Sequence, residues 1–329
     1  MKRFFFDLIS PLNTPVLFVL IGFIIHACLA KDITGDLGRI GQIVFSKEYH
    51  TQSKFEEHID KHLYWCSTNE LKSFDMVFMG DSFTESVYPY YLSHNVEKNT
   101  ALYKASEIVS SEQIFVALCN SGVVMPHVVV LEDVERSFIE RLGNLDFNPA
   151  NNSTLPIGLV YKPKNEKTTD FATFYKNQLI DNHSVRHVRL KDSLFSCPKK
   201  EKDLYFYYED LRFPVDAQIQ TAMSKLDTLF QIANKNNVQL FYVVASDKYD
   251  VYQEFAIDNK YPKKDLMDSF SKFEANPYFV NTKHVLLKNA RQGVKDLYYA
   301  DDTHWSPVGA KMVAEEIAKR MDSLGVFHN

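Results

Sequence analysis

Short apolar runs alternate with amphipathic stretches along most of this chain. The runs at 76–79, 127–131 and 238–245 are bounded by polar or turn residues, as expected for strands buried on both faces. Between them, the apolar residues of 112–118 and 219–233 favour helices, and the second stretch shows a clear helical spacing. Strands that alternate with helices predict an α/β fold, in which a parallel sheet carries helices on both sides.

The chain is predicted to close with a helix whose start is well marked. Ser306 is a typical cap and Pro307 suits the first helical turn. The inner face of this helix is formed by Met312, Val313, Ile317 and Met321. In the same way, Asp216 is the predicted cap of the helix before the strand at 238–245, and 101–104 is predicted as a further strand.

The alternation stops between residues 147 and 213. This segment is polar and charged, with basic clusters at 162–167 and 199–202. A connection of this length inside a compact domain is either functional or an insertion. We interpret 147–213 as an insertion, a lid or a partner-binding element. The alternative is a long loop that is merely exposed to solvent. The catalytic domain would then comprise 74–146 and 214–329.

The N-terminus has the pattern of an export or anchoring segment. Lys2 and Arg3 precede an apolar stretch that extends to residue 30. Positive residues before an apolar core are typical of a signal peptide or an uncleaved signal anchor. For residues 1–30 we favour a single-pass anchor over cleavage or lipidation. The body would then lie outside the cytoplasm, periplasmic or extracytoplasmic, with 31–73 as a juxtamembrane lead-in.

Composition narrows the possible functions. The chain has 329 residues, enough for one large or two modest domains, and a net charge of −5 without a long basic run. A nucleic-acid function therefore has little support. Aromatic residues make up 14% of the chain, which suits either a carbohydrate-facing surface or an aromatic core. No cysteine or histidine spacing indicates a metal site. An exported protein permits a disulfide between Cys66 and Cys197.

Two motifs carry the candidate chemistry. Ser82 follows the apolar run 76–79 in the motif Gly-Asp-Ser-Phe, at the end of a predicted strand where open α/β sheets bind their ligands. A helix predicted at 84–92 would point its amino terminus at a developing oxyanion. His304 lies in Asp-Asp-Thr-His-Trp, with carboxylates two and three positions before it. We predict Ser82 as nucleophile and His304 as its base, rather than a helix cap and a core histidine.

These residues resemble the SGNH (GDSL-like) hydrolases, which have a GDS serine near the start and an Asp/His pair near the end. In detail the chain is closest to the SGNH-like domain of the alginate O-acetyltransferases, through GDSF at 80–83 and DTHW at 302–305. The segments 126–136 and 245–252 are also similar to that domain. In the alginate enzymes DTHW precedes GDSF, whereas here it follows. The resemblance implies an SGNH-type three-layer sandwich.

The resemblance implies further site residues. Ordinary SGNH spacing selects Asp301 as the acid and DTHW selects Asp302, which we favour. For the oxyanion hole it implies the backbone N–H of Ser82 and a glycine donor, which we place at Gly122 in Asn120-Ser121-Gly122. The GxND segment of ordinary SGNH hydrolases is not found after 128–131, and this departure favours the acetyltransferase branch.

Four other residues belong to the predicted surroundings of the site. Arg136 is expected either to bind an acceptor or to pair with Glu132. Lys248 and Tyr252 resemble family positions near the site, without an assigned role. Trp305 is expected to pack under the histidine, with stacking on a sugar ring as the alternative.

The function that this resemblance implies is an O-acetyltransferase, which transfers acetyl groups to an extracytoplasmic polysaccharide through a serine acyl-enzyme. It also implies a partner, a membrane-bound O-acyltransferase that supplies the acetyl group, and no soluble cofactor. The first alternative is a carbohydrate or lipid esterase that uses water as acceptor. The second is a non-catalytic assembly subunit of an envelope polysaccharide machine.

Overall fold

The core of the protein is a six-stranded, all-parallel sheet with the strand order β1-β3-β2-β4-β7-β8. The computed structural model describes residues 18–22, 35–41, 43, 63–85, 87–104, 109–148 and 184–327. The strands span, in sheet order, Tyr64–Trp65, Thr100–Lys104, Met76–Gly80, Val128–Val134, Gln239–Ala245 and Phe279–Asn281. The predicted parallel α/β architecture is thereby confirmed.

The register of the central strands places their ends at common edges. Met76 of β2 pairs with Thr100 of β3 and with Val128 of β4, and β4 pairs with β7 from Val128 to Val134. Both faces of these strands are buried, which explains their continuous apolar sequences. The carboxyl ends of β2, β4 and β7 therefore lie at one edge of the sheet, where Ser82 follows β2.

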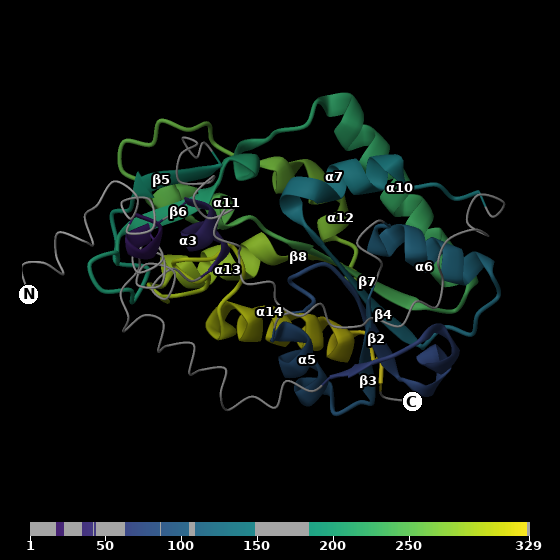
Figure 1. Cartoon of the computed structure of the whole chain (residues 1–329). Coiled ribbons are helices and arrows are strands. Elements are labelled where there is room, and N and C mark those ends of the chain that lie inside the picture. The colour runs from purple at the N-terminus through teal and green to yellow at the C-terminus, as the bar shows by residue number, and fades with distance from the viewer. Residues whose placement is uncertain are drawn as a thin grey trace, which may run out of the picture.

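Helices cover both faces of the sheet and give the three layers of the fold (Figure 1). One face packs against the helices α5, α11, α13 and α14, which span Tyr88–Val96, Lys248–Tyr252, Thr282–Arg291 and Pro307–Ser323. The other face packs against α6, α7, α10 and α12, which span Ser111–Asn120, Glu135–Asn144, Asp216–Lys235 and Ser271–Glu274. Alternate residues of each strand face the two layers, as the pleat requires.

The predicted starts of two helices, α14 and α10, lie at or within one residue of the observed starts. The Ser306 hydroxyl accepts the backbone N–H of Val308 at 3.0 Å, and Pro307 is the first residue of α14, as predicted. At α10 the capping position is Val215 rather than Asp216. The Val215 N–H donates to the side chain of Gln218 at 3.0 Å, so a glutamine three residues on replaces the expected acidic cap.

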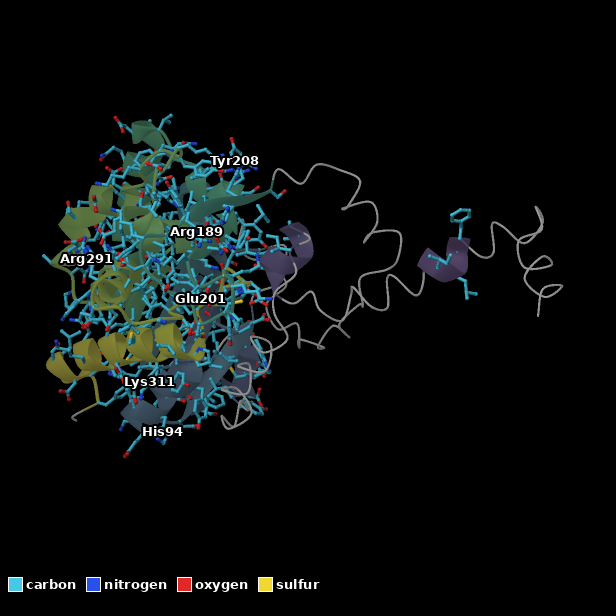
Figure 2. The ribbon with its side chains drawn as sticks, turned by 90° about the vertical axis from the view of Figure 1, so that its left-hand side faces the viewer. His94, Arg189, Glu201, Tyr208, Arg291 and Lys311 are labelled. Carbon is cyan, nitrogen blue, oxygen red and sulfur yellow. The ribbon has the colours of Figure 1, made fainter. Side chains whose placement is uncertain are left out.

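Part of the segment predicted as an insertion belongs to the core. Residues 185–189 and 203–207 form an antiparallel hairpin of strands β5 (Val185–Arg189) and β6 (Asp203–Tyr207). Several side chains of this region are buried in the cluster that includes α11 and α14, namely Leu190, Leu194, Phe195, Cys197, Leu204 and Phe206. The alternative, a loop that is merely exposed to solvent, is therefore wrong for this part. The opposite face carries polar residues such as Arg189, which is exposed, and Tyr208, in the 3-10 helix directly after β6, is exposed as well (Figure 2).

The hairpin explains why the segment is polar in sequence, because only one of its faces is buried. Residues 149–183, the rest of the predicted insertion, lie outside the described residues. Short 3-10 helices complete the described chain, at Thr68–Ser73, Tyr208–Leu211, Gln253–Phe255 and Leu266–Phe270.

Most of the predicted anchor and lead-in also lies outside the described residues. None of the helices in the described part of the chain has the length and apolar character that a membrane span requires. The described residues of the lead-in include the short helix α3 (Asp36–Gly41), which packs beside β5 and β6. The disulfide that an exported protein would permit between Cys66 and Cys197 is not formed. Both residues are buried free thiols. Burial raises the pKa of Cys66 to about 12.

Candidate active site

Ser82 lies on a tight turn that a buried carboxylate from the neighbouring strand holds in place. Oε2 of Glu132, on β4, accepts the backbone N–H groups of Asp81 and Thr84, both at 3.2 Å, and the Thr84 hydroxyl at 2.9 Å. A side chain at Gly80 would collide with Thr84 and Glu132. The glycine of the motif is therefore required by the close approach of this carboxylate to the turn.

The helix predicted directly after the serine is not present. Residues 82–85 form a turn, and α5 begins at Tyr88, with Pro89 in its first turn. The backbone N–H groups of Asp81 and Thr84 are bound by Glu132 and do not lie free at a helix amino terminus. The expected contribution of a helix amino terminus at Ser82 is therefore wrong. The Ser82 N–H remains the predicted oxyanion donor.

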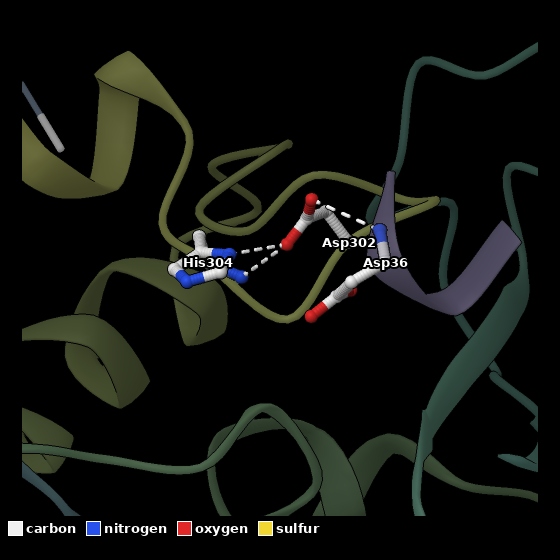
Figure 3. Close-up of side chains that lie close together, drawn as sticks. All are labelled: Asp36, Asp302 and His304. Carbon is white, nitrogen blue, oxygen red and sulfur yellow. Dashed lines mark hydrogen bonds and ion pairs between the residues drawn. The ribbon is translucent and has the colours of Figure 1, made fainter. Parts of the chain in front are cut away.

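Ser82, His304 and Asp302 lie in the order and at the distances of a nucleophilic triad. His304 Nε2 is 2.7 Å from the Ser82 hydroxyl, and Nδ1 is 2.5 Å from Oδ1 of Asp302. Oδ1 also accepts the His304 backbone N–H at 3.0 Å, so the imidazole is held against the carboxylate (Figure 3). With Nδ1–H donating to Asp302, Nε2 can accept the serine proton.

The electrostatics of the pair favour charge separation. Burial alone would raise the pKa of Asp302, but its hydrogen bonds to His304 and the charge of that residue outweigh burial and hold the pKa below its usual value. Burial would lower the pKa of His304, but the hydrogen bond and charge of Asp302 raise it instead. Asp302 therefore stays ionised and stabilises the imidazolium that forms when His304 takes a proton.

The geometry distinguishes the two candidate acids. The backbone N–H and the ring Nδ1 of His304 both form hydrogen bonds with Oδ1 of Asp302. Asp301 is buried, and its carbonyl accepts the backbone N–H of Gly38 at 3.1 Å. The spacing of the DTHW motif, rather than the ordinary SGNH spacing, thus matches the arrangement of the loop.

Lys248 shapes the loop that carries the acid. Its Nζ donates to the carbonyls of Tyr299, Ala300 and Asp302 at 2.6, 3.1 and 3.1 Å. Burial lowers the pKa of Lys248 to about 8, although the nearby Asp301 and Asp302 oppose this effect. Three carbonyl acceptors occupy the ammonium, so the role of Lys248 is to support the loop rather than to contact a substrate.

Two of the predicted aromatic residues serve as packing. Trp305 is buried and lies edge-on against Phe83 at 4.8 Å, and Phe83 in turn contacts the ring of His304 at 4.9 Å. Trp305 is thus packed in the interior, as expected, and is not placed to stack on a sugar ring. Tyr252 is fully buried, and its ring lies 5.8 Å from that of Tyr298, just before the catalytic loop. Both residues are therefore part of the buried core.

Arg136 forms a buried ion pair, although not with the predicted Glu132. Its guanidinium donates to Asp247 at 2.8 Å and lies 3.6 Å from Asp210. Lys264 binds the second oxygen of Asp247 at 2.5 Å. Burial alone would lower the pKa of Arg136, but the two carboxylates raise it. The structure therefore supports the salt-bridge alternative for Arg136 over acceptor binding.

Gly122 and Asn120 do not lie at the site. Asn120 is the last residue of α6, and Gly122 follows it. This helix runs back from the carboxyl edge of the sheet to its amino edge, and residue 128 then begins β4. The Val128 N–H donates to the carbonyl of Asp75, which immediately precedes β2. Both residues are thus at the edge opposite Ser82, and their assignment to the oxyanion hole is wrong.

The sequence did not identify two residues that hold the segments on which the catalytic groups lie. Glu132 follows an apolar run at the carboxyl edge, and a buried carboxylate at that point was the available signal. Asp36 lies beside Asp302 and His304, and their ligand atoms lie within 4.8 Å of one another, close enough to hold a metal ion. The hydrogen bonds that occupy these atoms instead match a triad with a supporting acid. The contact of Asp36 with Asp302 joins residues 266 positions apart and has no local signal.

A parallel sheet with a Ser–His–Asp arrangement at its carboxyl edge is an α/β architecture that carries the side chains of a nucleophilic acyl-transfer or hydrolytic site. Residues 201–328 match the family model described as SGNH hydrolase-like domain, acetyltransferase AlgX. The match includes Asp302 and His304 and confirms the resemblance for that part of the chain, while Ser82 lies outside it. Comparisons with curated proteins and with solved structures gave no match.

The buried Glu132 carboxyl provides a test of how the nucleophile turn is held. We expect Glu132→Ala to lower the free energy of unfolding by about 3 kcal/mol or more, because it leaves two buried N–H groups and a hydroxyl unpaired and opens a cavity. Glu132→Gln keeps an acceptor oxygen and should cost much less. Chemical denaturation of the two variants measures the difference. Equal losses would show that the hydrogen bonds of the turn contribute little.

The wild type and Glu132→Gln should also respond differently to pH. Burial, together with the charge of Asp81, raises the pKa of Glu132 well above its usual value. A carboxyl with a raised folded pKa contributes stability that is complete below its ordinary pKa and is lost as the pH rises towards the folded value. Glutamine does not titrate, so the stability of Glu132→Gln relative to wild type should increase between pH 4 and neutral pH.

Proposed function

We propose that this protein is an O-acetyltransferase that transfers acetyl groups to an extracytoplasmic polysaccharide. The observation that carries the proposal is the aligned triad, in which His304 contacts Ser82 at 2.7 Å and Asp302 at 2.5 Å. The family match of residues 201–328 adds the acetyltransferase class. Ser82 is exposed to solvent, so a sugar hydroxyl can reach it.

The mechanism follows from the geometry of the three side chains. Ser82 Oγ attacks the acetyl carbonyl carbon of the donor while His304 Nε2 takes the hydroxyl proton. The tetrahedral intermediate collapses, the donor oxygen leaves with the proton from His304, and an acetyl ester remains on Ser82. An acceptor hydroxyl then gives its proton to His304 and attacks this ester. The proton returns to Ser82 as the acetylated product leaves, and Asp302 remains ionised throughout.

The proposed setting of the reaction is the outer side of a membrane. The basic and apolar N-terminal residues support an anchor, and a membrane-bound O-acyltransferase is the proposed source of acetyl groups. A second candidate function is an esterase, which would use the same triad with water as the acceptor. The exposed Ser82 favours both equally. The aligned triad argues against a non-catalytic subunit, which has no chemical need for all three groups.

One experiment separates transfer from hydrolysis. The purified protein is incubated with a small acetyl ester and a panel of oligosaccharides, and the products are identified by mass spectrometry, with Ser82→Ala as the control. Acetylated sugar above the control supports the proposal, and free acetate alone supports the esterase. A wild type that matches Ser82→Ala in both products contradicts both functions.

The anchor gives a further prediction. Deletion of residues 1–30 should leave hydrolysis of a small acetyl ester unchanged, because the triad and α3 lie downstream. Exported without its anchor, the same protein should lose most polymer acetylation in cells, since the anchor raises the effective concentration of the domain beside its donor. Acetylation of the polymer is measured in cells that express either form. Full acetylation by the untethered form would show that the anchor is dispensable.

A further inference from the structure

The lead-in helix α3 contacts the catalytic loop from a distant part of the chain. The backbone N–H of Asp36 donates to Oδ2 of Asp302 at 3.1 Å. Because Oδ1 of the same carboxylate faces His304, Asp302 is held at both oxygens (Figure 3). The hydrogen bond at Oδ1 orients the imidazole of His304. The hydrogen bond at Oδ2 fixes the rotation of the carboxylate about its side-chain bond.

The side chain of Asp36 holds the next residue of the loop. Its carboxylate accepts the Thr303 backbone N–H at 2.9 Å and the Thr303 hydroxyl at 2.7 Å. The backbone N–H of Gly38 donates to the Asp301 carbonyl at 3.1 Å. Three consecutive residues of the loop, from Asp301 to Thr303, are therefore bonded to α3, so the contact determines the conformation of the whole acid-bearing turn.

The close approach of α3 to the loop depends on a glycine. Gly35 has φ of +67°, and a Cβ at this position would collide with the Asp301 carbonyl. Glycine adopts this left-handed conformation without steric penalty and leaves room for the loop backbone. The sequence at residues 35–36 thus fits this contact in two ways, through the small residue that permits it and the acid that forms it.

We propose that Asp36 is a positioning residue of the active site and that residues 35–41 complete the triad from outside the catalytic body. The inference rests on the proposed acyl transfer for its effect on rate. Asp36 acts through Asp302 and Thr303 and does not touch the reacting atoms. The segment that follows the predicted anchor is then a functional part of the site rather than a connection.

The charge of Asp36 also reaches His304. The carboxylate of Asp36 faces Asp302 and His304 on the loop and Tyr207 at the end of β6. Two cations, Arg136 and Lys248, lie behind these groups. Burial and the charge of Asp302 raise the pKa of Asp36, while Thr303 and His304 oppose this. In its ionised form Asp36 stabilises the imidazolium. Removing the charge should therefore lower the pKa of His304.

The direct test is an NMR titration of His304 in the full-length chain, because it does not depend on activity. Asp36→Asn preserves the backbone N–H and the shape of the side chain but removes the charge. We expect the pKa of His304 to fall by about one unit. The matched control is Asp227→Asn, which neutralises an exposed aspartate on α10, across the sheet, and should leave the value unchanged. An unchanged value in Asp36→Asn, or an equal fall in the control, would overturn the inference.

Kinetics with a small acetyl ester give the second measurement. Asp36→Ala removes both bonds to Thr303, and we expect kcat to fall by roughly 10–100-fold with KM nearly unchanged, since the residue does not touch substrate. In Asp36→Asn the acid limb of kcat/KM should move to lower pH, because the neutral base persists further. Wild-type kcat in Asp36→Ala would refute the positioning role. An inactive wild type would instead count against the proposed function, and the titration would still decide the role of Asp36.

Discussion

Ser82→Ala and His304→Ala should each reduce acyl-transfer and esterase activity by a factor on the order of 10⁴ or more. The two side chains act as a unit across 2.7 Å, since the hydroxyl is a poor nucleophile without the base and the base has no proton to take without the hydroxyl. For the same reason the double variant should be little worse than either single one.

The measurement is the rate of acetyl ester hydrolysis and of sugar acetylation by each variant, with thermal unfolding to show that the fold is intact. Ser121→Ala provides a matched control, because that serine lies at the opposite edge of the sheet, where its hydroxyl donates to Leu118 at 2.9 Å. It should retain full activity. A Ser82→Ala protein that retained more than about a tenth of the wild-type rate would refute the nucleophile assignment.

The parts of the fold that the sequence predicted are those with strong local signals. The central strands are buried on both faces, so their apolar runs are continuous and easily recognised. Ser82 and His304 were identified because each lies in a motif whose residues are adjacent in sequence. The hairpin of β5 and β6 was missed, since a strand with one buried face inside a charged segment resembles a loop.

The misplaced oxyanion donor has a different cause. Gly122 follows a helix at a plausible distance from the preceding strand, but in a parallel sheet each helix returns the chain to the amino edge. A residue at the end of α6 therefore lies opposite the nucleophile, whatever its type. The predicted parallel topology was by itself sufficient to exclude it. The direction of the chain, and not the spacing of residues along it, determines at which edge Gly122 lies.

The contacts of Asp36 and Glu132 show what local patterns leave out. Asp36 lies in a glycine-containing lead-in, and its role arises only when the chain returns 266 residues later. Glu132 is next to an apolar run, but its acceptor role depends on the turn that follows a different strand. Both residues stabilise backbone geometry around a catalytic group through long-range hydrogen bonds, and the partners of such bonds cannot be identified from a single sequence.

Asp302→Asn should lower kcat far more than Asp301→Asn, by a factor of up to about 10⁴. Oδ1 of Asp302 accepts from His304 Nδ1 at 2.5 Å and fixes the tautomer in which Nε2 can take the serine proton. An asparagine at this position can turn its amide N–H towards the ring and stabilise the wrong tautomer. It also removes the charge that stabilises the imidazolium.

Asp301→Asn keeps the backbone carbonyl through which Asp301 meets α3, so the loop retains that contact and the imidazole retains its partner. The two variants differ by one position and carry the same chemical change, so each serves as the control for the other. The comparison is made on kcat for a small acetyl ester, together with NMR of the His304 ring nitrogens to report the tautomer. If Asp301→Asn proved the crippling variant, the ordinary SGNH spacing would apply. The carboxylate that faces His304 would then be a structural group rather than the triad acid.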